Sequence, residues 1–210
     1  MKPSAPIKLY RHALSGHSHR VELFAALLGL PLDLIDVDLA AGAHKEPKFL
    51  ARSPFGQVPA IEDGDVVLAD SNAILVYLAK RYGAGLNWLP EAPLDAARVQ
   101  KWLSVASGQL ASGPAAARLV NVFGATLDHE RAKQIANGLY QVLERELANA
   151  EFLIGAQPTI ADVAMYSYTA HAPEGDVSLA SYPNIREWLG RIEALAGFVP
   201  MQKTAIGLAA

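Results

Sequence analysis

The chain has 210 residues, of which 51% are hydrophobic and 19% charged, and its formal net charge is −3. This balance indicates a globular protein with a sizeable core, and the scattered lysines and arginines argue against a nucleic-acid-binding surface. No apolar run is long enough to cross a bilayer and no apolar signal core begins the chain, so we expect a cytoplasmic protein without a membrane partner.

The first part of the chain alternates strand and helix signals. Residues 7–10 predict a strand, residues 20–29 a helix, and residues 31–36 a second strand. Two short apolar runs then flank the turn Glu-Asp-Gly-Asp at 62–65, which is typical of a hairpin, and a helix begins at residue 70. This order predicts an α/β thioredoxin-like domain over residues 1–82.

The remainder of the chain shows helical signals alone. A stretch rich in glycine and proline at 83–92 predicts a linker, and an all-α helical bundle is expected over residues 93–210. Its first helix is predicted over 94–110, with Ser112-Gly113-Pro114 breaking or kinking it. Thr159 and Asp162 have the spacing of a capping box, which we interpret as a folding element rather than a catalytic one.

The polar loop at 11–19 precedes the first predicted helix and carries two serines. Any anion held in this loop would feel the positive end of the helix dipole, and a serine hydroxyl could donate a hydrogen bond to it. Ser15 and Ser18 are both candidates for this role, and His17, which lies in the same loop, could also reach the anion. Ser18 immediately precedes the apolar helical run, so it is predicted to be the N-cap of the helix.

Two dipeptides flank the predicted hairpin. Proline has no N–H and belongs at the head of a strand, and Val58-Pro59 is also a bond at which a cis peptide costs little. A cis bond there would leave the Val58 backbone free to pair with an extended peptide. Asp70 and Ser71 begin a helix whose N–H groups favour carboxylates, and Asp70 could hold an ammonium group. The alternative is that either residue is only a helix cap.

The stretch AHKEPKFLARSPFGQVPAIEDG at 43–64 resembles the N-terminal domain of a glutathione S-transferase, and is most similar to bacterial, serine-type, phi-like members. The resemblance covers nearly the whole chain and includes the capping box and IREWL at 185–189. It implies a homodimeric detoxification enzyme that conjugates reduced glutathione, its cosubstrate, to small hydrophobic electrophiles. The family usually has Glu or Gln where this chain has Asp70.

The resemblance also implies roles for individual residues. Ser15 lies five residues before the Arg of an Arg-Val pair, which is the position of the catalytic serine. The residues at glutathione-binding positions are His44, Lys45, Gln57, Val58, Pro59, Asp70 and Ser71. The candidate wall of the electrophile pocket is Leu14, Leu103, Ser107, Leu110, Ala111, Pro114 and Phe123. Phe55 is expected to contact the partner subunit of a dimer, or alternatively to plug its own domain.

Several other functions remain compatible with these residues. The same site could support a glutathione-dependent peroxidase, isomerase or dehalogenase, or the protein could be a non-enzymatic ligand carrier or interaction module. The absence of cysteine excludes disulfides and catalysis by a protein thiol. His12, His17, His19 and His44 lack the spacing of metal ligands, so no metal is expected.

Overall fold

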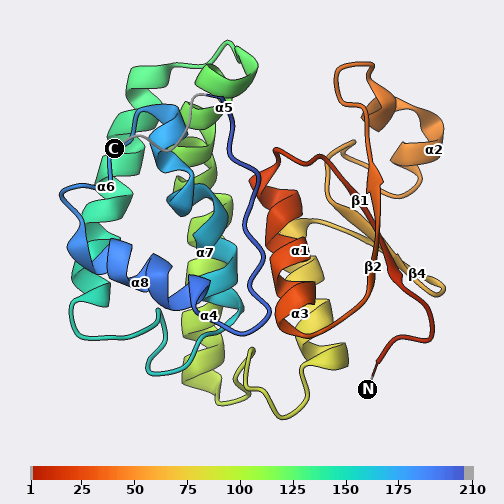
Figure 1. Ribbon diagram of the computed structural model, residues 1–210, viewed down its shortest axis with the longest axis horizontal. Coiled ribbons are helices and arrows are strands. Elements are labelled where there is room, and N and C mark those ends of the chain that lie inside the picture. The colour runs from red at the N-terminus through yellow and green to blue at the C-terminus, as the bar shows by residue number, and fades with distance from the viewer. Residues whose placement is uncertain (1, 206–210) are drawn as a thin grey trace. The chain divides into compact units, whose positions relative to one another are not determined.

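The computed structural model describes residues 2–205, which form two compact units (Figure 1). The first unit extends to Leu89 and also includes Ala196–Met201 near the end of the chain. The second unit comprises Pro90–Leu195 and continues from Gln202. Within residues 2–205, no helix combines the length and the apolar character needed to cross a membrane.

The first unit is built on a four-stranded sheet with the strand order β2-β1-β3-β4. The strands are β1 (Ile7–Arg11), β2 (Leu32–Asp36), β3 (Ala60–Asp63) and β4 (Val66–Ala69). β1 runs parallel to β2 and antiparallel to β3, and the β3–β4 hairpin turns at Asp63-Gly64-Asp65-Val66 as the Asp-Gly signal predicts. The helices are α1 (Gly16–Leu27), η1 (Ala43–Lys45), α2 (Pro47–Leu50) and α3 (Ser71–Tyr82). This is the predicted thioredoxin-like arrangement.

The two faces of the sheet are covered by different helices. Ile7 and Leu9 of β1 are buried, and α1 and α3 lie side by side on one face of the sheet (Figure 1). Tyr10 alternates to the opposite side of the strand, where its ring meets Phe49 of α2 edge-on at 6.4 Å between centroids. Because β1 and β4 each run antiparallel to β3, the loops that lead from β1 to α1 and from β4 to α3 lie at the same end of the sheet.

The start of α1 differs from the prediction. The helix begins at Gly16, four residues earlier than expected, and its N-cap is Ser15 rather than Ser18. The Ser15 backbone is extended, with φ −87° and ψ 116°, and its Oγ accepts the Ser18 N–H at 3.3 Å. Ser18 is instead a buried residue of the first helical turn. The sequence did not predict this helix start, because the first turn consists of polar residues and glycine, whereas helical periodicity is recognised from recurring apolar residues.

The second unit is all helical. Its helices are α4 (Pro93–Ser107), η2 (Ala111–Ala115), α5 (Ala116–Phe123), α6 (His129–Leu147), α7 (Ile160–Ala170), η3 (Ala172–Gly175) and α8 (Pro183–Glu193). α7 is buried from Ile160 to Thr169 and packs against α4, and α8 packs against α6. A helix that is buried on all sides forms the centre of a bundle, so the second unit is organised around α7.

The α-helix is interrupted near the predicted break or kink at Ser112-Gly113-Pro114. α4 ends at Ser107 rather than at the predicted residue 110, and Gly108 follows with a non-helical ψ of −96°. The backbone passes through a π-helical turn, η2, and continues directly into α5. A Cβ atom at Gly113 would lie 2.8 Å from the backbone N of Ala136, so glycine lets α6 approach this turn closely. Pro114 lacks an N–H, and the wider π turn accommodates it without ending the helical path.

The capping box at the start of α7 is confirmed. The Asp162 carboxylate accepts the Thr159 N–H at 2.8 Å, and the Thr159 side chain caps the first turn. Asp162 also accepts hydrogen bonds from the Leu153 N–H and from the Trp188 indole of α8, both at 2.9 Å. A single buried carboxylate thus joins α7, the preceding loop and α8, which supports its interpretation as a folding residue.

A second buried charge cluster was not predicted. Arg118 of α5 donates to Glu174 of η3, and both side chains are at most 1% exposed. The other Glu174 oxygen accepts the Thr204 N–H at 2.7 Å. Burial alone raises the pKa of Glu174, but the Thr204 N–H and the Arg118 guanidinium outweigh it and hold this pKa below its ordinary value. The cluster fixes Thr204 to the helical unit.

Candidate functional site

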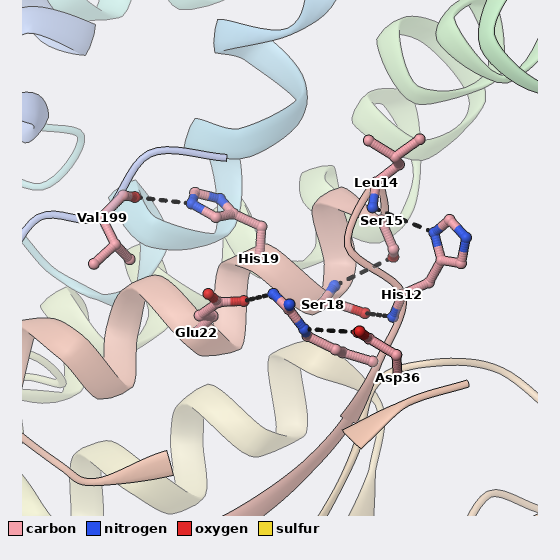
Figure 2. A network of polar contacts seen from close by, with 9 residues as sticks. His12, Leu14, Ser15, Ser18, His19, Glu22, Asp36 and Val199 are labelled. Carbon is pink, nitrogen blue, oxygen red and sulfur yellow. Dashed lines mark hydrogen bonds and ion pairs between the residues drawn. The ribbon is translucent and has the colours of Figure 1, made fainter. Parts of the chain in front are cut away.

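The loop between β1 and α1 presents the Ser15 hydroxyl at the N-terminus of a twelve-residue helix (Figure 2). Ser15 is partly exposed, and its Oγ acts as an acceptor toward the Ser18 N–H. A hydroxyl that accepts a hydrogen bond keeps its own proton for donation. The positive end of the α1 dipole and this O–H group would both stabilise an anion placed beside Ser15.

The other serine of the loop is structural. Ser18 is 1% exposed, and its Oγ accepts the His12 N–H at 3.3 Å (Figure 2). His12 in turn accepts the Leu14 N–H on Nδ1 at 3.3 Å, which fixes the loop that carries Ser15. Between the two candidates, Ser15 is therefore the one whose hydroxyl is accessible to a ligand.

The N-terminus of α3 presents Asp70 and Ser71. Asp70 is the N-cap, with Oδ1 accepting the Ala73 N–H at 2.9 Å, and its backbone, at φ 72° and ψ 119°, lies outside the regions that residues with a Cβ atom commonly adopt. Asp70 is exposed, so its second carboxylate oxygen faces solvent and is available to an ammonium group. The cap function and a ligand-binding function are thus compatible in one side chain.

Arg20 of α1 extends to the same helix end, and the sequence did not predict this link. Its Nη1 donates to Ser71 Oγ and to Asn72 Oδ1, both at 2.8 Å, and the side chain is 1% exposed. Because a guanidinium group only donates, Ser71 must accept from it and keeps its own proton. A buried cation behind a helix N-terminus makes this position favourable for a carboxylate.

The Val58–Pro59 peptide bond is cis, as the resemblance implies. Pro59 is buried and directly precedes β3. Among the described residues, neither the N–H nor the C=O of Val58 has a backbone hydrogen-bond partner. An extended peptide could therefore pair with Val58 as an additional strand would.

The loop before Val58 carries the remaining polar candidates. Lys45 Nζ donates to the carbonyls of Phe55 and Gly56 at 3.3 and 3.2 Å, so its charge is held on this loop. Gln57 has an exposed side chain, while its backbone makes two hydrogen bonds with the Ser53 hydroxyl, at 2.8 and 3.2 Å. His44 is partly buried in η1. These residues form a polar, positively charged edge of the first unit.

Phe55 lies at the tip of this loop and is 81% exposed. It therefore does not plug its own domain, which was the alternative interpretation of this residue. Its ring is accessible on the surface of the first unit, and aromatic residues are enriched in protein–protein interfaces.

The residues predicted to line an electrophile pocket come from both units. Leu14, in the first unit, is partly buried in the loop before Ser15. The others follow one another along α4, η2 and α5 of the second unit. Leu103, Leu110 and Pro114 are buried, Ala111 is partly buried, and Ser107 and Phe123 are exposed. Within residues 2–205, no group of His, Asp and Glu side chains is arranged to hold a metal ion.

Comparisons with known proteins agree with this geometry. Residues 5–80 match the family model "Glutathione S-transferase, N-terminal domain", and residues 121–196 match "Glutathione S-transferase, C-terminal domain". Glutathione S-transferase 3 of Zea mays is 36% identical, with the alignment covering 97% of this chain and 95% of that protein. Human glutathione S-transferase theta-2B is 30% identical over 91% of this chain and 82% of its own.

Solved structures give the same result. A crystal structure of a glutathione S-transferase from Pseudomonas fluorescens Pf-5 superposes with a TM-score of 0.89 at 30% identity, covering 95% of this chain and 100% of that one. The chain therefore belongs to the glutathione S-transferase family, whose enzymes use glutathione as a cosubstrate. The predicted family and the two-part fold class are thereby confirmed.

Proposed function

We propose that this protein catalyses the transfer of the glutathione thiolate to small hydrophobic electrophiles, with Ser15 stabilising the thiolate. The observation that carries the proposal is the placement of the partly exposed Ser15 hydroxyl at the N-terminus of α1 with its proton free for donation. A free thiol with a pKa of about 8.5 is only a few per cent ionised at pH 7. A donated hydrogen bond and the helix dipole both lower that pKa.

The remaining contacts would hold glutathione in an extended conformation. The γ-glutamyl carboxylate lies at the N-terminus of α3, where Ser71 donates to it, and the ammonium group meets the exposed oxygen of Asp70. Support comes from the buried Arg20 behind Ser71, which makes this helix end electropositive. The cysteinyl backbone pairs with Val58, which precedes Pro59. Support comes from the N–H and C=O of Val58, which have no backbone hydrogen-bond partner within the described residues.

The glycyl end of glutathione lies toward the polar edge formed by His44, Lys45 and Gln57. A cation and an amide donor suit a terminal carboxylate, since hydrogen bonds to charged groups are stronger than neutral ones. In this arrangement the two carboxylates of glutathione are held at opposite ends of the site. The sulfur between them is then positioned by the Val58 backbone at Ser15.

The electrophile is bound by apolar residues of the second domain. We assign the domains as residues 1–82 for glutathione, 83–92 for the linker and 93–210 for the electrophile, although Ala196–Met201 form part of the first compact unit. Residues 1 and 206–210 of this assignment lie outside the described residues. The proposed wall in the second domain is Leu103, Ser107, Leu110, Ala111, Pro114 and Phe123. In the reaction, the thiol proton passes to solvent, the thiolate attacks an electrophilic carbon and a C–S bond forms. At a carbon that bears a leaving group, this group departs with its electron pair. At an epoxide or an enal, the displaced electron pair stays in the product, which takes a proton from solvent.

We further propose that the protein acts as a cytoplasmic homodimer, with Phe55 as a contact to the partner subunit. The 81% exposure of this aromatic side chain leaves it accessible to a partner, and aromatic residues are enriched in protein–protein interfaces. Its position on the loop before Val58 would make the contact contiguous with the glutathione-binding residues.

A conjugation assay tests the proposed function. The wild-type protein is incubated with reduced glutathione and a panel comprising an activated chloroarene, an epoxide, an enal, a hydroperoxide and an isomerisable alkene, and products are identified by mass. Conjugates carrying the glutathione sulfur are expected. Turnover only with peroxides, or only in isomerisation or dehalogenation, would replace transfer by that reaction, and bound glutathione without turnover of any compound would indicate a ligand carrier.

A further inference from the structure

We propose that His17 is a positioning residue that sets the direction of the Ser71 hydroxyl toward the γ-glutamyl carboxylate of glutathione. This inference rests on the proposed function, since His17 would contact Ser71, and Ser71 would contact glutathione. It gives His17 a role at the carboxylate rather than at the sulfur.

Two side chains of α1 converge on one hydroxyl group of α3. His17 and Arg20 are three residues apart, so they share the face of α1 that packs against α3. Arg20 Nη1 lies 2.8 Å from Ser71 Oγ, and His17 Nδ1 lies 3.4 Å from the same oxygen. Ser71 is 4% exposed, so its hydroxyl is governed by neighbouring side chains rather than by bulk water.

The hydrogen-bonding capacity of Ser71 limits what His17 can do. A hydroxyl has one proton and two lone pairs, and Arg20 occupies one of the lone pairs. Burial, and secondly the Arg20 cation, lower the pKa of His17 to about 3, so its imidazole is neutral at pH 7. A neutral Nδ1 either accepts the Ser71 proton or carries a proton and donates to the second lone pair.

These two tautomers have different consequences for a ligand. When Nδ1 accepts, the Ser71 proton is held toward His17 and is not available to an anion. When Nδ1 donates, both lone pairs of Ser71 are occupied, and its proton points in the remaining direction, away from Arg20 and His17. A carboxylate at the N-terminus of α3 accepts this proton and thereby selects the second tautomer, with no net change in the number of bound protons.

The separation of 3.4 Å is long for such a hydrogen bond. Hydrogen bonds within a binding site often shorten in the complex with the ligand. His17 would then donate to Ser71, and Ser71 to the carboxylate. The contribution of His17 therefore depends on the Ser71 hydroxyl and on the ligand carboxylate, and it requires no contact with the thiol.

Calorimetric binding of glutathione to a set of variants tests this dependence. His17→Ala should weaken glutathione binding about fivefold, as expected for the loss of one neutral hydrogen bond. His17→Asn should restore most of the affinity, because its amide lies near the position of Nδ1. His17→Gln is the matched control, since its longer side chain places the amide near Nε2, and it should not restore affinity. The pKa of the bound thiol should be unchanged in all three variants.

A double-mutant cycle supplies the decisive comparison. In a Ser71→Ala background, His17→Ala should cause no further loss of affinity. A second comparison uses a glutathione analogue in which a 4-aminobutyryl group replaces γ-glutamyl, so that the α-carboxylate is missing. The single variant His17→Ala should bind this analogue with the same affinity as the wild type. The proposal would be overturned if His17→Ala lowered the affinity about fivefold in either comparison, or if it raised the thiol pKa of bound glutathione. Failure of the wild-type protein to bind glutathione would instead refute the proposed function.

Discussion

Replacing Ser15 by alanine removes the hydroxyl that we place against the glutathione sulfur. Hydrogen bonds to charged groups contribute about 1.5–3 kcal/mol. Because one pKa unit corresponds to about 1.36 kcal/mol, the thiol pKa of bound glutathione should rise by about one to two units. Below that pKa, the thiolate fraction and kcat/KM should fall about 10- to 100-fold. Glutathione affinity should change little, since the γ-glutamyl and backbone contacts remain.

The same substitution also removes a helix cap. Ser15 Oγ accepts the Ser18 N–H, and loss of such an N-cap costs about 1 kcal/mol. This is a small part of the stability of a typical domain, so Ser15→Ala should fold with a slightly lower unfolding midpoint. Ser15→Thr keeps both the hydroxyl and the cap, and it should retain a low thiol pKa.

The assay is an ultraviolet titration of the thiolate in the enzyme–glutathione complex between about pH 5 and about pH 9. Ser181→Ala is a matched serine control, because Ser181 is exposed on the second unit, and both its activity and the thiol pKa should equal the wild-type values. An unchanged thiol pKa in Ser15→Ala would refute the assignment. A shift in Ser18→Ala alone would transfer the role to Ser18.

Further predictions concern charge, assembly and stability. Asp70→Asn keeps the N-cap and tolerates φ 72° but loses the charge, so glutathione binding should weaken about tenfold or more at an unchanged unfolding midpoint; equal affinity would remove Asp70 from the site. Phe55→Ala should raise the dimer dissociation constant in ultracentrifugation about 30-fold, the effect of a hot spot of about 2 kcal/mol, and no change would exclude this contact. Arg118→Leu should lower the free energy of unfolding by about 3–5 kcal/mol, because it leaves Glu174 buried without its partner, and a loss below about 1 kcal/mol would contradict the buried pair. The pKa of Glu174 is lowered in the folded state. The ionised carboxylate therefore stabilises the fold fully at a pH above the ordinary pKa, and this stabilisation is lost as the pH falls through the lowered pKa. In urea unfolding, Glu174→Gln should destabilise the protein strongly at pH 7 and progressively less below about pH 4.

Local chemistry was sufficient to predict much of the first unit. The Asp-Gly turn, the proline at the head of β3 and the helix start at Asp70 each depend on a few adjacent residues, and all three are found in the structure. The capping box of Thr159 and Asp162 is likewise encoded within four residues. Features of this kind can be recognised before the fold is known.

Features that depend on distant parts of the chain were not predicted. Arg20 and Ser71 are 51 residues apart, and Arg118 and Glu174 are 56 residues apart, so the sequence shows no pattern that pairs them. A lone arginine in an apolar helix was the one available signal, because a buried cation needs a partner. The helical path through Pro114 was missed for a similar reason, since it depends on the close approach of α6 at Gly113.

The most direct test of the central claim is calorimetric binding of reduced glutathione to the wild-type protein, combined with titration of the thiolate absorbance of the complex. The arrangement of Ser15, Val58 and Ser71 predicts saturable binding, with the thiolate appearing at least one pH unit below the free-thiol pKa of about 8.5. Binding with an unshifted thiol pKa would contradict the role of Ser15. Absence of binding would contradict the glutathione site as a whole.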